Sequence, residues 1–518
     1  MDTSLRPDPL PPAALSALIS GLGLVGDTDS REPVTGITLD SRAVQPGWLY
    51  VAVPGSRAHG AQFAASAIES GAVAVLTDDA GMELIGPSLV PVVAAEDVRT
   101  AMATVAARLF GEPAREMTML GVTGTNGKTT TVALLQSGLM AAGVPTGTIG
   151  TIGFRLGTQE LRSSRSTVTT PESPDLQGLL AVMQRRGAQA VALEVSSHAM
   201  ALERVDAIGF DAVGFLNLGR DHLDFHHTIE DYFEAKARLF EPGRSAVSVI
   251  WVDDERGQEL ARRVAQHGQS RLVTVGTTEG VDYLLADYEA VAPLGGVATV
   301  VRGGEALELE LTLPGRYNMI DAAVALAMLE AVGVPAPAAL AGLRAAQVPG
   351  RMQRVDLGDD APLVVVDFAH TPQAVEAALS SLAGIGPVIS VLGCGGDRDP
   401  DKRPGMGAAA ANGSALAIIT DDNPRTEDPS TIRAQTLEGA RSAADAGEVI
   451  EVAGRRAAIE EAIGRAGTGT VVAILGKGHE RGQILADRVV DFDDVEEARR
   501  AWRRRVEEGA SDASAHDE

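Results

Sequence analysis

The chain has 518 residues, of which 70 are acidic and 44 basic, and its formal net charge is −26. This length allows about three domains of ordinary size, and the acidic balance argues against nucleic acid or an anionic membrane as the main partner. The single cysteine, Cys394, excludes an internal disulfide, and neither a signal pattern nor an apolar run of the ~20 residues that span a membrane is present. We therefore expect a cytoplasmic protein.

Residues 1–113 predict a small α/β domain. Strands are expected at residues 49–53 and 72–76 and near residue 92, with a helix over residues 61–71. The polar residues 40–42 offer hydroxyl and guanidinium groups to a ligand, although an ordinary polar loop explains them at least as well.

A second domain, residues 114–349, begins with a phosphate-binding pattern. The apolar run 117–122 enters a glycine-rich turn, after which apolar residues recur at helical spacing over residues 132–139. A strand, loop and helix of this kind direct backbone N–H groups and a helix N-terminus at phosphate, and Lys128 could reach the outer phosphates. The strict motif requires glycine where this chain has Val122, so the loop is a variant, and a glycine-rich turn with an incidental lysine is the alternative.

Further buried strands are expected at residues 190–195, 212–216 and 247–252, with helices between them. This alternation predicts a mainly parallel sheet that helices cover on both faces. Residues 297–301 and 307–313 flank a turn and predict an added antiparallel hairpin.

A third domain is expected over residues 350–508, followed by a disordered tail at residues 509–518. Its strands are predicted at residues 363–366, 388–392, 415–420 and 471–475. Each ends in polar or glycine-rich residues, the edge at which open, Rossmann-like α/β sheets bind ligands.

Lysine is scarce in this chain, because 40 of the 44 basic residues are arginine. A chain with this bias is expected to keep lysine where a compact ammonium or a deprotonatable amine is required, although some lysines can be leftovers. The candidates are Lys128, Lys236, Lys402 and Lys477.

Two predicted strands of the second domain end in residues suited to metals. Glu194 ends one strand, and His222 follows the next. Magnesium prefers carboxylate and phosphate oxygens and takes imidazole less often, so Glu194 is the stronger candidate, and His222 alone could be structural.

The next predicted helix starts at Thr228, which with Asp231 forms a capping box. Lys236 lies on the apolar stripe of this helix. A buried lysine must be paired or lose its proton. A neutral amine can react with carbon dioxide to give a carbamate, an anionic metal ligand. A buried ion pair and a side chain that reaches solvent are the alternatives.

Together these motifs resemble those of the Mur ligases, most closely the type that adds the third residue of the muramoyl peptide. The resemblance covers the whole chain and rests on residues 121–130, 169–173, 194–198, 217–224 and 232–236. It implies three α/β domains and ATP-dependent amide formation in peptidoglycan precursor synthesis. In that reaction ATP phosphorylates a substrate carboxylate, an amine attacks the acyl phosphate, and phosphate leaves.

The resemblance also implies an ATP site with two magnesium ions, which would neutralise the anions that phosphoryl transfer brings together. It implies that Thr129 and Glu194 serve one magnesium, and that His222 with carbamylated Lys236 serves the other. Asp321 stands where the family often has asparagine, so its contact is open. The implied ATP-binding residues are Gly124, Thr125, Asn126, Gly127, Lys128, Thr129, Thr130, Asn318, Arg351, Asp367 and His370.

For the UDP-muramoyl dipeptide, the resemblance implies one set of residues at the uridine end and another at the dipeptide. Leu202 replaces a glutamine of some relatives, so no polar contact is assigned to it. The uridine set is Leu39, Ser41, Ser56, Arg57 and Ala58, and the dipeptide set is Thr169, Thr170, Ser196 and Arg204.

The added amino acid is expected to be diaminopimelate. Its distal carboxylate and ammonium could pair with Arg425 or Arg398 and with Glu480, whereas lysine would leave an arginine unpaired. Arg425 taken alone could equally be a surface arginine in a turn. The residues that resemble this binding site are Arg398, Asp422, Asn423, Pro424, Arg425, Gly476 and Glu480.

The sequence thus predicts a monomeric cytoplasmic ligase that joins meso-diaminopimelate to UDP-N-acetylmuramoyl-L-alanyl-D-glutamate, with ATP and Mg²⁺. The stereoisomer does not follow from the residues. The alternatives are a folylpolyglutamate synthase-like ligase, whose folate site would not explain residues 1–113 or 422–425, and a nucleotide-binding regulatory protein. Retention of Lys128, Glu194, His222 and Lys236 argues against a regulatory protein.

Overall fold

The structure is a computed structural model that describes residues 7, 10–28, 32–55, 58–161, 168–291, 294–358 and 360–516. Only the backbone is described for residues 224 and 509–516. The chain divides into two compact units. Unit 1 holds residues 1–285, 301–305 and 320–343, and unit 2 holds residues 286–300, 306–319 and 344–518. The expected boundary at residues 113 and 114 falls inside unit 1.

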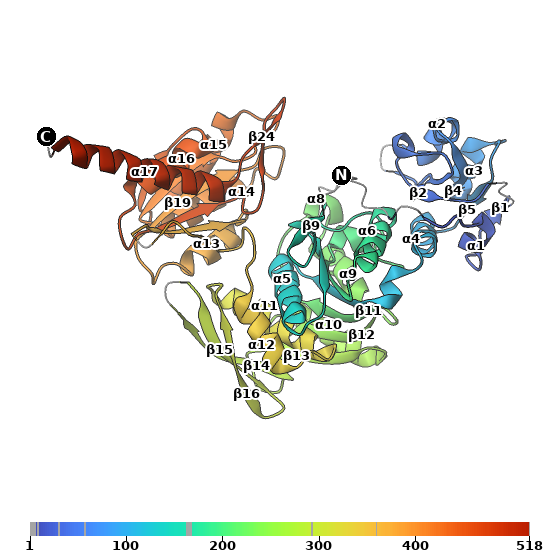
Figure 1. The fold of residues 1–518 in the computed structure, drawn as a ribbon, viewed down its shortest axis with the longest axis horizontal. Coiled ribbons are helices and arrows are strands. Elements are labelled where there is room, and N and C mark those ends of the chain that lie inside the picture. The colour runs from blue at the N-terminus through green and yellow to red at the C-terminus, as the bar shows by residue number, and fades with distance from the viewer. Residues whose placement is uncertain are drawn as a thin grey trace. The chain divides into compact units, whose positions relative to one another are not determined.

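Unit 1 begins with a five-stranded sheet in the order β1-β5-β4-β3-β2, drawn in blue in Figure 1. All its neighbouring strands are parallel except β1 and β5, and the three predicted strands are β3, β4 and β5. The strands are β1 (Val25–Gly26), β2 (Gly36–Thr38), β3 (Trp48–Val51), β4 (Ala72–Thr77) and β5 (Val92–Ala94). The helices are α1 (Leu15–Ile19), α2 (Ala64–Glu69), α3 (Asp79–Ile85) and α4 (Val98–Leu109), with 3₁₀ turns at Ser41–Ala43 and Gly60–Phe63.

A second sheet has 11 strands, and eight of them, all in unit 1, run in the order β13-β12-β11-β6-β10-β7-β8-β9. It is parallel from β13 to β7, and β8 and β9 add an antiparallel edge. Central β6 therefore ends at the same edge as its neighbours β10 and β11. The bounds are β6 (Thr118–Thr123), β7 (Thr146–Gly150), β8 (Gly153–Leu156), β9 (Gln159–Leu161), β10 (Ala190–Glu194), β11 (Phe210–Phe215), β12 (Ser245–Trp251) and β13 (Arg271–Gly276).

Helices pack on both faces of this sheet, as the sequence predicts. Val213 of β11 belongs to a buried cluster with residues of α6 and α10. Gly214, the next residue, points to the other face, where an added Cβ would lie 2.6 Å from Met328 Sδ of α11. The helices are α5 (Lys128–Ala141), α6 (Ser173–Arg185), α7 (Ser197–Ala201), α8 (Leu223–His226), α9 (Ile229–Ala237), α10 (Glu255–His267), α11 (Arg316–Ala331) and α12 (Ala336–Ala345), with 3₁₀ turns at Pro113–Glu116 and Arg238–Phe240.

The predicted hairpin is present as β15 (Gly296–Arg302) and β16 (Glu305–Leu311), joined by Gly303 and Gly304, which both have positive φ. It follows β14 (Tyr283–Ala290), which the sequence did not predict. Two glycines in the left-handed region suit a two-residue hairpin turn.

Unit 2 contains a six-stranded sheet in the order β17-β18-β22-β19-β20-β21. Only β17 is antiparallel to its neighbour, and β18, β19, β20 and β22 match the four predicted strands. The bounds are β17 (Gln353–Val355), β18 (Leu363–Asp367), β19 (Val388–Cys394), β20 (Leu416–Asp421), β21 (Glu448–Glu451) and β22 (Val471–Leu475), with a separate hairpin of β23 (Gly482–Ile484) and β24 (Val489–Asp491). The helices are α13 (Pro372–Ser380), α14 (Lys402–Asn412), α15 (Pro429–Ser442), α16 (Arg455–Arg465) and α17 (Asp494–His516).

Helix α17 continues into residues 509–516, which the sequence analysis expected to be a disordered tail. The backbone there is helical, and three alanines in this stretch favour a helix. Figure 1 shows α17 in red, ending at the C-terminus.

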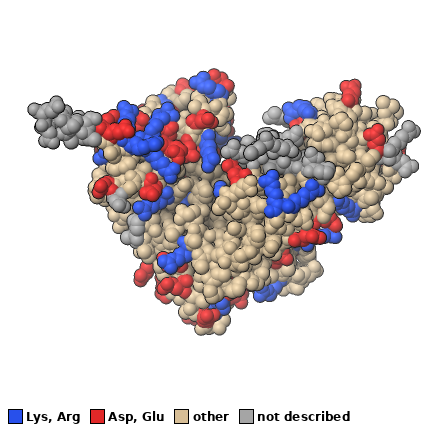
Figure 2. Space-filling model, in the orientation of Figure 1, with Lys and Arg blue, Asp and Glu red and all other residues tan. Residues whose placement is uncertain are grey.

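Charged side chains are interspersed on the face of the molecule that Figure 2 shows, with red and blue groups side by side. Among the ion pairs of unit 1, Arg256 pairs with Glu230 and Glu259, and Arg263 pairs with Glu234 and Glu259. Within the described residues, no helix is both long and apolar enough to cross a membrane.

Candidate active site

The loop between β6 and α5 forms the centre of the candidate site in unit 1. Gly127 has a φ of 88°, and a Cβ there would lie 2.3 Å from Asp321 Oδ1, so this position requires glycine. Helix α5 begins at the next residue, Lys128. Lys128 Nζ donates to the carbonyls of Gly124 at 2.8 Å and Thr125 at 3.0 Å, and thereby closes the loop on itself.

The segment after β11 holds this loop in place through hydrogen bonds. Asn126 N donates to Asn217 Oδ1 at 3.0 Å, and Asn217 Nδ2 donates back to the Asn126 carbonyl at 3.2 Å. Thr125 N donates to the Asn217 carbonyl, and Gly219 N donates to Thr125 Oγ1. The loop after β6 and the segment after β11 are thus held together by hydrogen bonds.

Lys236 is buried, with 1% of its surface exposed, on the face of α9 that the periodicity predicted. Its Nζ donates to the Gly124 carbonyl at 2.9 Å and lies 4.5 Å from the centre of the Tyr232 ring. Burial, and then the positive charge of Lys128, hold the pKa of Lys236 well below its usual value. The hydrogen-bond acceptor of Lys236 is thus a backbone carbonyl, while the charge of Asp221 opposes the lowering of its pKa.

Glu194 ends β10 and is also buried. Its carboxylate accepts hydrogen bonds from Thr151 N at 2.9 Å and Thr151 Oγ1 at 3.0 Å. Glu194 and Thr129 line a cavity of about 10 Å³ together with Thr148, whose buried Oγ1 has no hydrogen-bond partner among the described residues.

The hydroxyl and carboxylate oxygens of Thr129, Thr148 and Glu194 on this cavity are of the kind that magnesium prefers as ligands. Within the described ranges, no three His, Cys, Asp or Glu residues are grouped so that they could hold a metal by themselves. A cation here would therefore share its ligands between the protein and phosphate or water oxygens.

His222 precedes α8 in the left-handed conformation, with φ 55°, which is unusual outside glycine. Its ring centre lies 4.8 Å from that of His198 and 6.1 Å from that of Tyr232. Because Tyr232 also contacts Lys236, the structure brings His222 and Lys236 into one neighbourhood. His226, which no sequence pattern marks, is buried here and bonds Ser197 Oγ through Nε2 at 2.9 Å.

The residues expected at the dipeptide lie beside Glu194. Thr170 Oγ1 donates to the Glu194 carbonyl at 2.8 Å, and Ser196 N donates to Thr170 Oγ1 at 3.2 Å. Thr169 Oγ1 lies 3.2 Å from Thr151 Oγ1, which itself bonds the Glu194 carboxylate. The structure therefore brings three of the four expected residues into contact around one strand end.

Arg204, the fourth, is fixed by Glu172. Its Nε and Nη2 donate to Glu172 Oε1 at 3.0 and 2.7 Å, and its Nη1 donates to the Thr170 carbonyl at 2.9 Å. Arg99 of α4 donates to the other oxygen of Glu172 at 3.0 Å. The sequence analysis gave no role to Glu172 or Arg99. Glu172 lies inside the motif at residues 169–173, but nothing local marks Arg99.

At the expected uridine site, Leu39 and Ser41 are half-buried and Ala58 is exposed, whereas Ser56 and Arg57 lie outside the described residues. Ser41 begins a 3₁₀ turn that Asp40 caps by accepting from Arg42 N at 3.0 Å. Nearby, Tyr50 donates to the Gly60 carbonyl at 2.9 Å, and burial raises the pKa of this phenol from 10.0 to about 12.

Three of the expected nucleotide residues of unit 2, Arg351, Asp367 and His370, lie close to β17 and β18, and the fourth, Asn318, lies in α11. Asp367 ends β18 and accepts from the backbone of Met352 at 2.7 Å and of Ala369 at 2.8 Å. Burial raises the pKa of Asp367, and nearby Arg351 opposes the shift. Arg351 lies over the Phe368 ring, and His370 bonds the Phe368 carbonyl through Nδ1 at 2.8 Å. Asn318 Nδ2 donates to the Pro314 carbonyl at 2.6 Å.

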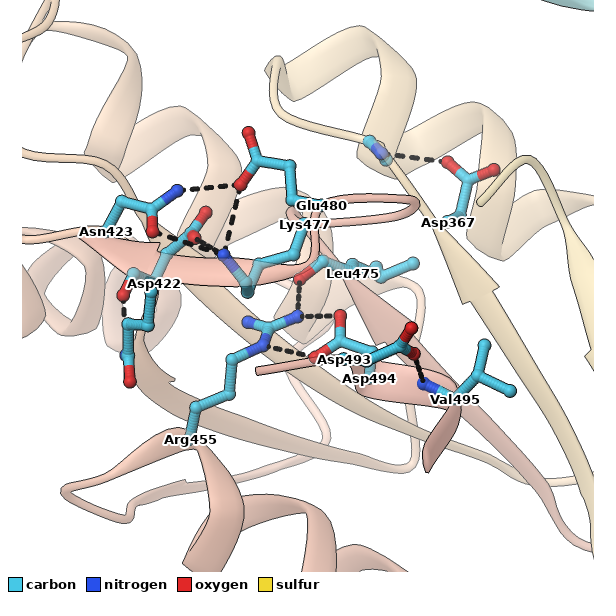
Figure 3. A network of polar contacts seen from close by, with 12 residues as sticks. Asp367, Asp422, Asn423, Arg455, Leu475, Lys477, Glu480, Asp493, Asp494 and Val495 are labelled. Carbon is cyan, nitrogen blue, oxygen red and sulfur yellow. Dashed lines mark hydrogen bonds and ion pairs between the residues drawn. The ribbon is translucent and has the colours of Figure 1, made fainter. Parts of the chain in front are cut away.

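Several of the expected diaminopimelate residues lie after β20 and β22, and Figure 3 shows Asp422, Asn423 and Glu480 close together there. Asn423 Nδ2 donates to Glu480 Oε2 at 2.7 Å, and a Cβ on Gly476 would lie 3.2 Å from Asp422 Oδ2. Burial raises the pKa of Asp422, against the lowering effects of Arg455 and Lys477.

Two arginines were expected at the same site. Arg425, which follows Pro424, has a φ of 53°, and its Nη1 donates to the Gly396 carbonyl at 2.6 Å. Arg398 is exposed in the loop after β19. Of the lysines, Lys477 is fully buried, and Lys402 is half-buried at the start of α14.

Three family models match consecutive parts of this chain. The Mur ligase family catalytic domain matches residues 33–109, the Mur ligase middle domain residues 122–329, and the Mur ligase glutamate ligase domain residues 350–478. The chain is also 44% identical over 509 residues to UDP-N-acetylmuramoyl-L-alanyl-D-glutamate–2,6-diaminopimelate ligase of Streptomyces coelicolor, with 96% of this chain and 98% of that protein covered. The chain belongs to the Mur ligase family.

Other relatives of this Mur ligase carry the same name. The Corynebacterium glutamicum protein is 40% identical over 508 residues, with 94% of this chain and 96% of that protein covered. A solved structure of a UDP-N-acetylmuramoyl-L-alanyl-D-glutamate–2,6-diaminopimelate ligase has a TM-score of 0.70 at 31% identity and covers 95% of this chain and 99% of its own.

More distant structures share the fold alone. MurF from Acinetobacter baumannii has a TM-score of 0.63 at 18% identity, with 90% of this chain and 96% of that chain covered. Folylpolyglutamate synthase from Thermotoga maritima has a TM-score of 0.56 at 18% identity, with 72% and 89% covered. The expected α/β architecture and the expected family are thus confirmed.

Proposed function

We propose that this Mur ligase joins diaminopimelate to UDP-N-acetylmuramoyl-L-alanyl-D-glutamate in an ATP-dependent reaction. The observation that carries the proposal is the pair of sites described above. A phosphate-type loop next to a buried carboxylate and a buried lysine suits phosphoryl transfer, and a polar cluster at Asp422–Arg425 and Glu480 suits a doubly charged amino acid. The relatives of this name, which match nearly the whole chain, support the same reaction.

The proposed reaction has two steps. An oxygen of the dipeptide's terminal carboxylate attacks the γ-phosphorus of ATP, the bond to the β-phosphate oxygen breaks, and ADP leaves. The amine of diaminopimelate then attacks the acyl carbon, loses a proton, and displaces inorganic phosphate. The product is an amide, and the peptide carboxylate oxygen that attacked phosphorus leaves with the phosphate.

In this proposal the loop holds the triphosphate. Gly124 to Thr130 offer backbone N–H groups and the N-terminus of α5, and Lys128 would exchange its two loop carbonyls for phosphate oxygens. Thr129 and Glu194 would hold one magnesium ion, and His222 with Lys236 a second. Bound magnesium would neutralise the charge that builds up as phosphate and carboxylate meet.

Lys236 is proposed to act as a carbamate. A buried amine with a lowered pKa is neutral more often than an exposed one, and a neutral amine reacts with carbon dioxide. After carbamate formation, Lys236 would give up its hydrogen bond to the Gly124 carbonyl and would offer carbamate oxygens to a cation.

The remaining roles follow the resemblance. Asn318, Arg351, Asp367 and His370 are proposed to bind the nucleotide. The uridine end is assigned to Leu39, Ser41 and Ser56 to Ala58, within a substrate domain of residues 1–113. The dipeptide is assigned to Thr169, Thr170, Ser196 and Arg204, in a central domain of residues 114–349.

Residues 350–508 are proposed to bind the amino acid. Arg425 and Arg398 offer guanidinium groups to the distal carboxylate, and Glu480 offers a carboxylate to an ammonium group. Asp422, Asn423, Pro424 and Gly476 would shape this site. The meso isomer is our proposal, with a monomeric enzyme acting on small molecules in the cytoplasm.

An ATP-dependent ligation assay tests this function. The UDP-muramoyl dipeptide is incubated with ATP, Mg²⁺ and, in separate reactions, meso-diaminopimelate, LL-diaminopimelate or lysine, and the product is identified by mass. We expect product with the meso isomer. Product only with lysine would refute the specificity, and no product with any of the three would refute the ligase function.

A further inference from the structure

Lys477 is the most enclosed polar group at the candidate amino-acid site. Its side chain is fully buried, and Nζ donates to Asn423 Oδ1 at 3.2 Å, Glu480 Oε2 at 3.0 Å and the Gly482 carbonyl at 2.6 Å (Figure 3). An ammonium has three protons to donate, and these three acceptors use them all. Lys477 therefore acts on the protein's own groups rather than on a substrate.

The first of these groups is the Asn423 side chain. Its Oδ1 accepts from Lys477 Nζ and also from Ile484 N at 2.9 Å. An amide whose oxygen is held by two donors has its nitrogen fixed on the other side. That nitrogen donates to Glu480 Oε2 at 2.7 Å, so Lys477 sets the orientation of the whole Asn423 side chain.

The second group is the Glu480 carboxylate. Its Oε2 accepts from both Lys477 and Asn423. The other oxygen, Oε1, accepts no hydrogen bond from the residues that the structure describes. The Glu480 side chain is 35% exposed, so a ligand can reach it. One oxygen is thus tied to the protein, and the other is left for a ligand.

Two carboxyl groups share the ammonium group of Lys477. Arg455 and Asp494 form a fully buried ion pair at 2.7 Å, and Arg455 Nη2 also donates to the Leu475 carbonyl. Lys477 faces two carboxylates, Asp422 at 3.5 Å and Glu480 at 3.0 Å. Arg455 is already paired with Asp494, so the ammonium group of Lys477 is shared between Asp422 and Glu480.

We propose that Lys477 is a positioning residue for the diamino acid, and that it holds Asn423 and Glu480 so that Glu480 Oε1 receives an ammonium group of that substrate. This inference rests on the proposed function. Arginine cannot replace lysine here, because a planar guanidinium cannot converge on three acceptors that surround a single nitrogen.

The test compares Lys477→Met and Lys477→Arg with Ile463→Ala, a buried core position of the same unit. The measurements are kcat, the KM for diaminopimelate, the KM for ATP and the unfolding temperature. Both Lys477 variants are expected to raise the KM for diaminopimelate by about tenfold or more and to leave the KM for ATP within about twofold. Ile463→Ala is expected to lower the unfolding temperature and to leave both KM values within about twofold.

A purely structural role would lower the yield of active enzyme while the KM for diaminopimelate stayed unchanged, and that result would overturn the proposal. If Lys477→Met does not fold, Lys477→Arg keeps the buried charge and decides the question by the same KM. If the wild-type enzyme forms no product, the proposed function itself is refuted. If the wild type is active and the Lys477 variants keep its KM for diaminopimelate, only the role of Lys477 is refuted.

Discussion

Gly127 offers a sharp test of the nucleotide loop. Replacement by alanine would place a Cβ 2.3 Å from Asp321 Oδ1 and 2.8 Å from its Cγ, at a backbone φ of 88°. The close approach forces the loop or α11 to move. The left-handed backbone alone adds strain of about 1–3 kcal/mol.

When this strain of about 1–3 kcal/mol weakens the binding free energy of ATP by the same amount, Gly127→Ala lowers the affinity for ATP by about 5- to 150-fold. Nucleotide binding is measured by calorimetric titration with a non-hydrolysable ATP analogue. The double variant Gly127→Ala/Asp321→Ala removes the collision and keeps the backbone strain, so its affinity should lie between those of Gly127→Ala and wild type.

Gly143 supplies the matched control. It has a φ of 79° just after α5, and a Cβ there would meet no atom within 4 Å. Gly143→Ala therefore introduces similar strain away from the loop, and should lower stability by about 1 kcal/mol with unchanged ATP affinity. Wild-type affinity in Gly127→Ala, or an equal loss in Gly143→Ala, would refute the reasoning.

Three further predictions concern the other sites. Lys236→Ala should abolish ligation, with partial recovery in added acetate or formate if a carbamate is the missing group; full activity without additives would exclude that role. Arg425→Leu should raise the KM for diaminopimelate by about 10- to 100-fold, from a lost charge-assisted hydrogen bond, and reduce the preference over lysine; an unchanged preference would argue against Arg425 as a ligand. Burial raises the pKa of Tyr50 from 10.0 to about 12, because the folded protein favours the neutral phenol. The contribution of Tyr50 to the free energy of unfolding is therefore complete below pH 10 and is lost as the pH rises through about 12. Chemical denaturation of wild type and Tyr50→Phe across this range should show a steeper loss for wild type, and parallel curves would contradict the shift.

Local patterns in the sequence were enough to predict the elements that carry the candidate site. The apolar run before Gly124 became β6, and the capping pattern at Thr228 and Asp231 preceded α9, with Lys236 on its buried face. Periodicity and capping depend on residues a few positions apart, so they can be read from sequence.

Contacts between distant segments could not be predicted in the same way. Gly127 needs to be glycine because Asp321 approaches it, and Arg99 joins the candidate site only because α4 lies against Glu172. Lys477 was selected for its rarity alone, since its acceptor Asn423 belongs to another strand end. The strands β9 and β17 were missed because each has only three residues and lies at a sheet edge, and β7 was missed because its sequence, Thr-Gly-Thr-Ile-Gly, contains no apolar run.

The central claim is that this chain forms an acyl phosphate and transfers it to diaminopimelate. The most direct measurement uses UDP-muramoyl dipeptide with ¹⁸O in both carboxylates of the glutamate, and mass analysis of the phosphate released. One ¹⁸O per phosphate, released in step with tripeptide product and only when diaminopimelate is added, is the predicted result. Product formation with unlabelled phosphate would contradict the claim.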